Sequence, residues 1–310
     1  MRVFETILEA VGRTPLVRLR KLVGPEDATV LAKCEYLNPG GSVKDRMAMH
    51  ILAKAVQTGQ LKQGGTIVEN TSGNTGAGIA LWAAVNGFRC VFTIPDKMST
   101  EKVNTLKAMG AEVVVTPTNV PADSPDSYYE TAKRIARETP GSFYLNQYHN
   151  KLNIEAHYRS TGPEIWEDTE GKIDVFVAGI GTGGTVTGAG KVIKTAKPAV
   201  KVYAVEPKDS PLLTEGKAGP HKIQGIGANF IPSILDRVDY DQVIDATYAD
   251  AIATARRLCR EEGIFSGVST GAICWAALEV AKKLGAGKTV VFVVCDYGER
   301  YSTHELWSGA

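Results

Sequence analysis

Short apolar runs alternate with helix-like stretches along almost the whole chain, and this alternation constrains the fold more than any other feature of the sequence. Apolar runs separated by helix-length segments are typical of parallel strands joined by crossover helices. The pattern therefore predicts an α/β fold built from two βαβ blocks. Buried strands are expected at residues 66–69, 89–94, 112–115, 174–178, 201–205 and 289–294, and helices at 75–86, 99–109, 128–137, 185–194, 249–262 and 271–284.

The boundary between the two blocks falls near residue 150, although no low-complexity linker marks it. Residues 207–234 form the longest stretch with neither a helical nor a strand pattern. A structureless segment of that length inside a compact domain is usually functional. We therefore expect residues 207–234 to line a site.

Charge and composition exclude several classes of protein. Among 310 residues, Lys and Arg total 35 and Asp and Glu total 34, so the net charge of +1 provides no field for nucleic acid or an anionic membrane. No segment resembles a signal peptide or a membrane span, which favours a cytoplasmic protein. The five cysteines form no Cys-x-x-Cys pair, and no histidine lies at metal-ligand spacing, so neither a disulfide framework nor a metal site is expected.

A glycine loop at residues 179–185 (Gly-Ile-Gly-Thr-Gly-Gly-Thr) follows one predicted strand and opens a predicted helix. Backbone amides at such a position converge on a phosphate, helped by the helix dipole. A tight turn with glycines used only for packing is the simpler alternative. The same glycines also match a dinucleotide fingerprint, with Glu206 placed to bind a ribose, so a nicotinamide-dependent oxidoreductase stays open on this segment alone.

Lys44 lies just inside another predicted helix start, after Gly40, Gly41 and a possible N-cap at Ser42. A helix N-terminus disfavours a positive charge, so a lysine held there is a candidate for an uncharged, nucleophilic amine. The alternative is an ordinary solvated lysine.

Two polar loops also open predicted helices. Residues 69–76 (Glu-Asn-Thr-Ser-Gly-Asn-Thr-Gly) combine hydroxyls, an amide side chain and free helix amides, which suit a carboxylate ligand as well as a capping role. Residues 267–271 (Gly-Val-Ser-Thr-Gly) are compatible with a site or with an ordinary cap.

Taken together, five segments resemble one family: pyridoxal-phosphate enzymes of the tryptophan-synthase-β-like fold (fold type II), in the branch of cysteine synthases and cystathionine β-synthases. The resemblance implies two three-layer αβα domains with mostly parallel sheets and a homodimer. It places a smaller, mobile domain at residues 41–150 and a larger one at residues 1–40 plus 151–310. The segments occur in family order and are residues 38–46, 71–76, 181–185, 225–227 and 298–301.

The resemblance also implies a role for individual residues. Lys44 is similar to the lysine that binds the cofactor covalently and acts in catalysis. Asn74 and Ser269 resemble cofactor contacts at the phenolate oxygen and the pyridine nitrogen. The remaining residues implied are Gly181, Thr182, Gly183, Gly184 and Thr185 for the phosphate, and Thr71, Ser72, Asn74, Thr75, Gln147 and Gly225 for the substrate.

The reaction that the resemblance implies is β-replacement on O-acetylserine or serine by a thiol, through an aminoacrylate. A neutral Ser269 opposite the ring nitrogen makes the cofactor a partial electron sink, which favours expulsion of a β-leaving group. Sulfide as the acceptor gives cysteine, and homocysteine gives cystathionine. Ala228 stands where cystathionine β-synthases more often carry tyrosine, which favours cysteine synthesis. A catalytically silent binding subunit on the same fold is a further alternative.

Overall fold

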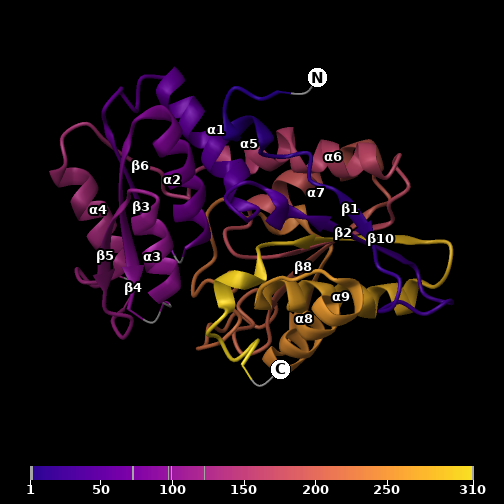
Figure 1. Cartoon of the computed structure of the whole chain (residues 1–310). Coiled ribbons are helices and arrows are strands. Elements are labelled where there is room, and N and C mark those ends of the chain that lie inside the picture. The colour runs from indigo at the N-terminus through magenta and orange to yellow at the C-terminus, as the bar shows by residue number, and fades with distance from the viewer. Residues whose placement is uncertain (1–2, 72, 97, 99, 122, 309–310) are drawn as a thin grey trace. The chain divides into compact units, whose positions relative to one another are not determined.

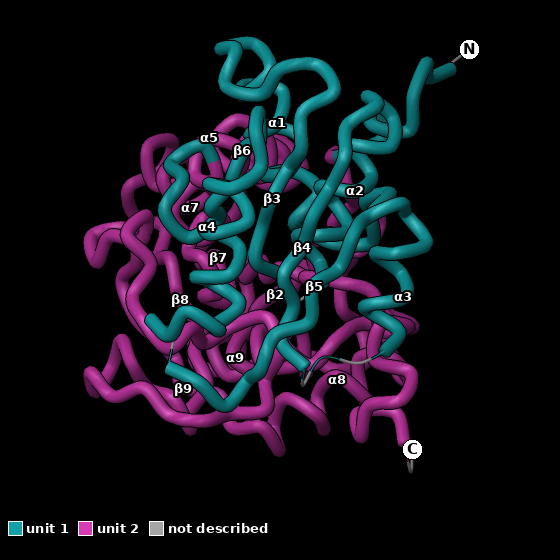
Figure 2. Tube along the Cα trace, turned by 90° about the vertical axis from the view of Figure 1, so that its left-hand side faces the viewer, with its two compact units in different colours: residues 1–11, 38–152 teal, residues 12–37, 153–310 magenta. Residues whose placement is uncertain are grey.

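The computed structural model describes residues 3–71, 73–96, 98, 100–121 and 123–308. Contacts within the chain divide it into two compact units (Figure 2). Unit 1 comprises residues 1–11 and 38–152, and unit 2 comprises residues 12–37 and 153–310. Residues 1–11 belong to unit 1 because η1 (Ile7–Ala10) packs against α2 (Asn74–Asn86).

Within its described residues, unit 1 contains a four-stranded parallel sheet in the order β5-β4-β3-β6. Helix α4 covers one face of this sheet, and α2 and α3 cover the other (Figure 1). Helix α1 packs against α2. The elements are α1 (Lys44–Gln57), β3 (Thr66–Asn70), α2, β4 (Arg89–Pro95), α3 (Thr100–Ala108), β5 (Glu112–Thr116), α4 (Tyr128–Glu138) and β6 (Ser142–Tyr144).

Unit 2 contains a six-stranded sheet in the order β1-β2-β10-β7-β8-β9, in which β1 alone runs antiparallel to its neighbour among the described strands. Helices α6 and α7 lie on one face, and α8 and α9 lie on the other (Figure 1). The elements are β1 (Leu16–Arg18), β2 (Thr29–Cys34), η2 (Glu35–Leu37), α5 (Leu152–Arg159), α6 (Thr161–Asp168), β7 (Val175–Gly179), α7 (Gly184–Ala196), β8 (Lys201–Pro207), η3 (Arg237–Asp239), β9 (Gln242–Ala246), α8 (Tyr248–Glu262), α9 (Val268–Leu284), β10 (Thr289–Val294) and η4 (Gly298–Tyr301).

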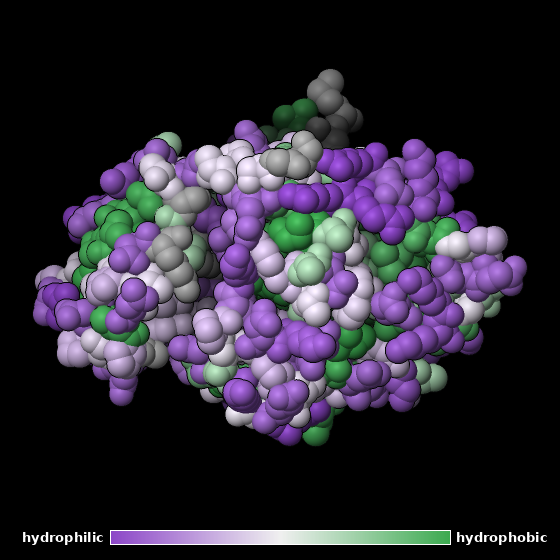
Figure 3. Space-filling model, turned by 90° about the horizontal axis from the view of Figure 1, so that it is seen from below, coloured by the Kyte–Doolittle hydropathy of each residue, from purple (hydrophilic) through white to green (hydrophobic). Residues whose placement is uncertain are grey.

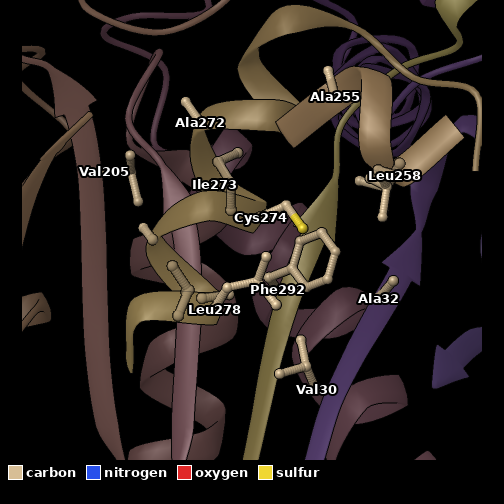
Figure 4. Packing of buried hydrophobic residues seen from close by; sticks show 14 of the residues in the cluster. Val30, Ala32, Val205, Ala255, Leu258, Ala272, Ile273, Cys274, Leu278 and Phe292 are labelled. Atoms are coloured by element: carbon tan, nitrogen blue, oxygen red, sulfur yellow. The ribbon is translucent and has the colours of Figure 1, made fainter. Parts of the chain in front are cut away.

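The main apolar core of unit 2 lies between its sheet and helices α8 and α9 (Figure 4). Phe292 of β10 lies beside Cys274 of α9 in this core, which also contains Val30 of β2 and Ile273 of α9, and all four are buried. Helix α9 is apolar around most of its circumference, because it is covered by the sheet on one side and by α8 on the other.

Each unit has three layers, with helices on both faces of a mostly parallel sheet, and this confirms the predicted fold class. The predicted buried strand at residues 112–115 is wrong in one respect: β5 is the edge strand of its sheet, and Val115 is 54% exposed. Residues 207–234 contain no helix or strand beyond the end of β8 at Pro207, as the sequence predicts. The predicted helix at 99–109 begins at Thr100, and Ser99 lies outside the described residues.

The surface is mainly hydrophilic in the view of Figure 3, with separate apolar groups between the polar residues. In the described part of the chain, no helix combines the length and apolar character needed to cross a membrane.

Candidate active site

The candidate residues divide between the two units. Unit 1 carries the 71–76 loop together with Lys44 and Gln147, and unit 2 carries the glycine loop together with Gly225 and Ser269. Ser72 lies outside the described residues.

Lys44 is the first residue of α1 and is half-buried. Its backbone N–H donates to Ser42 Oγ at 3.2 Å, so the Ser42 hydroxyl satisfies one of the first helical amides as expected, although the N-cap residue itself is Val43. The glycines before Lys44 have a steric role, because a Cβ on Gly40 would lie 2.5 Å from Oδ1 of the buried Asp45. The chain can therefore turn tightly into α1 only with glycine at residue 40.

The first turns of α1 and α2 are neighbours within unit 1. Gly78 lies one turn after Asn74, and a Cβ on Gly78 would lie 3.2 Å from Cα of Asp45. The absence of a side chain at Gly78 lets the two helices approach closely. This packing places Lys44 and Asn74 at the same end of the α1–α2 pair.

The 71–76 loop is held from within by a threonine. Thr71 Oγ1 accepts the N–H groups of Gly73 at 3.0 Å and Gly76 at 3.1 Å. Gly73 has φ of 130°, which a residue with a side chain rarely adopts. The loop conformation therefore depends on both the Thr71 hydroxyl and the glycine.

Gln147 reaches this loop because it follows β6, which is parallel to and paired with β3. The side-chain amide lies between three groups: Gln147 Oε1 accepts the Thr75 hydroxyl at 2.8 Å, and Nε2 donates to Glu69 Oε1 at 3.2 Å and to the Asn70 carbonyl at 3.1 Å. The Asn146 N–H donates to Glu69 Oε2 at 2.6 Å. Glu69, Gln147 and Thr75 thus form a continuous buried chain of hydrogen bonds.

Burial raises the pKa of Glu69 to about 8, even though the hydrogen bonds from Asn146 and Gln147 lower it. The pKa in the unfolded chain is 4.5, so between these values the folded state keeps a proton that the unfolded state loses. Glu69 therefore lowers the free energy of unfolding as pH rises from 4.5 to 8, by at most about 1.4 kcal/mol per pH unit.

We expect Glu69→Gln to remove this part of the pH dependence. Urea unfolding of both proteins at intervals from pH 5 to pH 9 measures it. The variant should gain stability relative to the parent protein as pH rises, and a constant difference between the two proteins across this range would contradict the assignment to Glu69.

In unit 2, the glycine loop joins β7 to α7 and leaves no room for side chains. A Cβ on Gly181 would lie 2.6 Å from the Gly225 carbonyl oxygen, and a Cβ on Gly184 would lie 2.1 Å from Asn153 Oδ1. Gly183 has φ of 87°. The N-terminus of α7 therefore presents bare backbone, the arrangement that binds anions at helix N-termini, and the Gly184 N–H donates to Thr182 Oγ1 at 3.4 Å.

Two buried side chains position the hydroxyls of this loop. Asn153 Nδ2 donates to Thr182 Oγ1 at 3.0 Å, and His157 Nε2 lies 3.2 Å from Thr185 Oγ1. His157 Nδ1 is also 2.9 Å from Thr161 Oγ1. Asn153 and His157 could not be identified from the sequence, because they lie on α5 and meet the glycine loop only in the folded chain.

Ser269 lies in the first turn of α9 and is buried. A Cβ on Gly225 would lie 3.5 Å from Ser269 Oγ, and Gly225 has φ of 97°. The Gly227 N–H donates to the Ile180 carbonyl at 2.8 Å. The tertiary structure of unit 2 therefore brings the glycine loop, Gly225 and Ser269 together.

Glu206, the candidate ribose ligand, has another function in the fold. Its buried carboxylate accepts the N–H groups of Leu213 and Thr214, each at 2.9 Å, and the Thr214 hydroxyl at 2.8 Å. These bonds anchor the long 207–234 segment to the end of β8. The geometry does not favour a ribose site at Glu206.

In the described part of the chain, no group of three or more His, Cys, Asp or Glu residues could hold a metal ion.

Residues 7–296 match the family model "Pyridoxal-phosphate dependent enzyme". A cysteine synthase of Staphylococcus aureus is 47% identical over 305 residues, covering 98% of this chain and 97% of that protein. The crystal structure of O-ureido-L-serine synthase superposes with a TM-score of 0.95 at 39% identity, covering 100% of this chain and 96% of the other. The O-acetylserine-dependent cystathionine β-synthase of Helicobacter pylori gives a TM-score of 0.93 at 35% identity, covering 99% and 100% respectively.

Proposed function

The chain belongs to the family of pyridoxal-phosphate-dependent enzymes, and on this premise we propose that it catalyses β-replacement on O-acetylserine by sulfide, forming L-cysteine and acetate. The observation that carries the proposal is the 47% identity to a cysteine synthase over nearly the full length of both chains. The family membership argues against the nicotinamide-dependent alternative, as does the engagement of Glu206 with Leu213 and Thr214.

The residues of unit 2 fit the cofactor. Gly181 and Gly184 form a cradle that any Cβ would fill, and the Thr182 and Thr185 hydroxyls supply further donors for a phosphate. Ser269 offers a neutral hydroxyl to the ring nitrogen. When bound, pyridoxal phosphate supplies an electron-accepting ring that stabilises negative charge at the substrate α-carbon.

In this proposal, Lys44 is the residue that would hold the cofactor covalently, through Nζ, and its amine would be released when the substrate binds. The released amine then takes the proton from the substrate α-carbon while acetate leaves from the β-carbon. Sulfide adds to the β-carbon, and Lys44 returns a proton to the α-carbon. One side chain thus serves as the covalent anchor and as the general base and acid.

The substrate carboxylate is proposed to bind at the 71–76 loop of unit 1. Helix α2 begins at Asn74, and the positive end of its dipole there favours an anion. Thr71, Ser72, Thr75 and Gln147 complete the proposed carboxylate site, and Gly225 is proposed to line the substrate side of unit 2. A carboxylate fixed there orients the α-carbon for proton transfer.

A second candidate is cystathionine formation with homocysteine as the acceptor. The similarity to the O-acetylserine-dependent cystathionine β-synthase of Helicobacter pylori favours it. Ala228 argues for the smaller acceptor, because it stands where the larger-thiol enzymes more often carry tyrosine. It is half-buried, in a small recess lined by Ile180, Gly181, Glu206, Leu212, Leu213, Gly227, Phe230, Ile231 and Pro232.

The test is product identification with the cofactor-loaded protein. O-acetylserine or serine is mixed in turn with sulfide or homocysteine, and the amino acids formed are identified by mass spectrometry. We expect L-cysteine from O-acetylserine and sulfide at the highest rate. Faster formation of cystathionine would establish the second candidate. If no pair of substrates gives a product, the proposed activity is refuted, and the chain is a cofactor-binding protein without it.

We also propose a cytoplasmic homodimer. None of the five cysteines takes part in a disulfide in the described part of the chain, which suits a reducing compartment. Val3, Phe4 and Ile7 are exposed apolar side chains in the N-terminal stretch of unit 1, a composition that favours burial against a partner. Light scattering on the purified protein measures the mass, and a monomer at micromolar concentration would contradict the dimer.

A further inference from the structure

Glu69 has no direct role in the proposed reaction, yet it is fully buried at the end of β3, immediately before the loop proposed to bind the substrate carboxylate. Burying a carboxyl group costs free energy unless its neighbours compensate. Its carboxyl oxygens accept hydrogen bonds from the segment after β6, namely from the Asn146 N–H and the Gln147 side-chain amide. The carboxylate therefore acts on that segment.

The orientation of the Gln147 amide is determined by these contacts. Nε2 faces two acceptors, Glu69 Oε1 and the Asn70 carbonyl, so the oxygen must be the atom that faces Thr75. Gln147 Oε1 then accepts the Thr75 hydroxyl, which lies inside the 71–76 loop. A rotated amide would place its oxygen against the Asn70 carbonyl, where two acceptors repel.

We propose that Glu69 is a positioning residue for the carboxylate-binding loop, which it holds through Gln147 and Thr75. This inference rests on the proposed function, because it assumes that the 71–76 loop binds the substrate carboxylate. Glu69 thus affects substrate affinity by keeping the 71–76 loop in the conformation that binds the carboxylate. Glu69 itself does not contact the substrate.

The charge of Glu69 determines how strongly it binds Asn146 and Gln147, since hydrogen bonds to a charged acceptor are stronger than those to a neutral one. With a pKa of about 8, the side chain is mainly ionised at pH 9 and mainly neutral at pH 6. The hydrogen bonds from Asn146 and Gln147 to Glu69 should therefore become stronger as pH rises from 6 to 9.

Few other groups near Glu69 change charge in this range. Helix α2, which packs on β3, has no titratable side chain. Burial raises the pKa of the tyrosines on the other neighbouring elements and that of Cys90, so these groups stay neutral. Tyr144 of β6 and Tyr148 after it interact electrostatically with Glu69, and the elements next to β3 also carry Tyr128, Tyr129 and Glu130 of α4 and Cys90 of β4.

The test is the binding of glycine to the cofactor-loaded protein, measured by the change in visible absorption. Glycine carries the carboxylate but no leaving group, so the measurement does not depend on turnover. We expect Glu69→Gln to raise the dissociation constant of glycine about tenfold at pH 9 and less than threefold at pH 6, where the parent side chain is itself neutral. The control Glu138→Gln makes the same chemical change at an exposed end of α4 and should alter neither value.

A double-mutant cycle with Gln147→Ala tests the route of the effect. If Glu69 acts through Gln147, adding Glu69→Gln to the Gln147→Ala protein should change glycine binding less than twofold. Equal or tighter glycine binding by Glu69→Gln at pH 9, or full additivity in the cycle, overturns the proposal.

The failure of the proposed function is distinguishable from the failure of this inference. A protein without β-replacement activity can still bind glycine, so the effect of Glu69 remains measurable. If glutamine at residue 69 prevents folding, Glu69→Asp provides the test. Aspartate keeps the charge, but its side chain is one methylene shorter, so its carboxylate lies farther from the Gln147 amide. Weaker glycine binding at pH 9 supports the proposal, and unchanged binding overturns it.

Discussion

Lys44→Ala is expected to lower the rate of β-replacement by about 10³-fold or more, the largest effect of any single substitution in this chain. In the proposed mechanism, Lys44 both anchors the cofactor and moves the proton at the α-carbon, and no water molecule can replace both roles. The rate of cysteine formation at saturating O-acetylserine and sulfide measures the loss. Lys44→Arg should be equally inactive, because it keeps the positive charge and loses the nucleophilic amine.

Lys54 is the matched control for Lys44. It lies in the last turn of α1 and donates to Gln57 Oε1 at 3.0 Å, so Lys54→Ala removes a lysine from the same helix without touching the candidate site. Borohydride treatment of the parent protein, followed by proteolysis and mass spectrometry, should place the cofactor on the peptide that contains Lys44. A label on any other lysine, or full activity in Lys44→Ala, would refute the assignment.

Gly184→Ala is expected to weaken cofactor binding by tenfold or more and to destabilise unit 2 by about 2 kcal/mol. The added methyl group would lie 2.1 Å from Asn153 Oδ1, and Asn153 is fully buried and cannot move aside freely. Displacing Asn153 also breaks its hydrogen bond to the Thr182 hydroxyl in the glycine loop. Titration of the cofactor-free protein with pyridoxal phosphate and urea unfolding measure the two effects.

Gly190→Ala in the same helix separates a local clash from the general effect of alanine. Its Cβ would lie 3.2 Å from two methyl carbons of Val202, a contact that a small shift relieves. Alanine also favours the helix over glycine by up to about 1 kcal/mol. Gly190→Ala should therefore keep the cofactor affinity of the parent protein. Equal effects at residues 184 and 190 would show that the glycine loop has no special steric requirement.

The central parallel strands could be predicted from the sequence because they are covered on both faces and consist of continuous apolar residues. Strands β7 and β10, and residues 202–205 of β8, belong to this class. Strand β2 could not be predicted, since Lys33 interrupts its apolar run. That lysine is fully buried and pairs with Glu164 at 2.9 Å and Asp168 at 3.2 Å, both on α6. No local pattern in the sequence indicates such a pairing between distant segments.

The short edge strands could not be predicted either, because their local sequence carries too little signal. Strands β1 and β6 span three residues each, too few for an alternating pattern to stand out. The exposure of β5 likewise depends on its place at the edge of the sheet, which follows from the strand order and not from its own residues.

The amino-acid sequence alone is sufficient to predict the fold class and the position of each glycine-rich or hydroxyl-rich loop at the start of a helix. These are local properties, because periodicity and turn chemistry act over a few residues. Only the tertiary structure decided that Asn153 and His157 support the threonines of the glycine loop, and that Glu69 holds Gln147 against Thr75. Such contacts join residues 28 to 78 positions apart, and neither the pairing of β3 with β6 nor the contact of α5 with the glycine loop can be recognised in the neighbouring sequence.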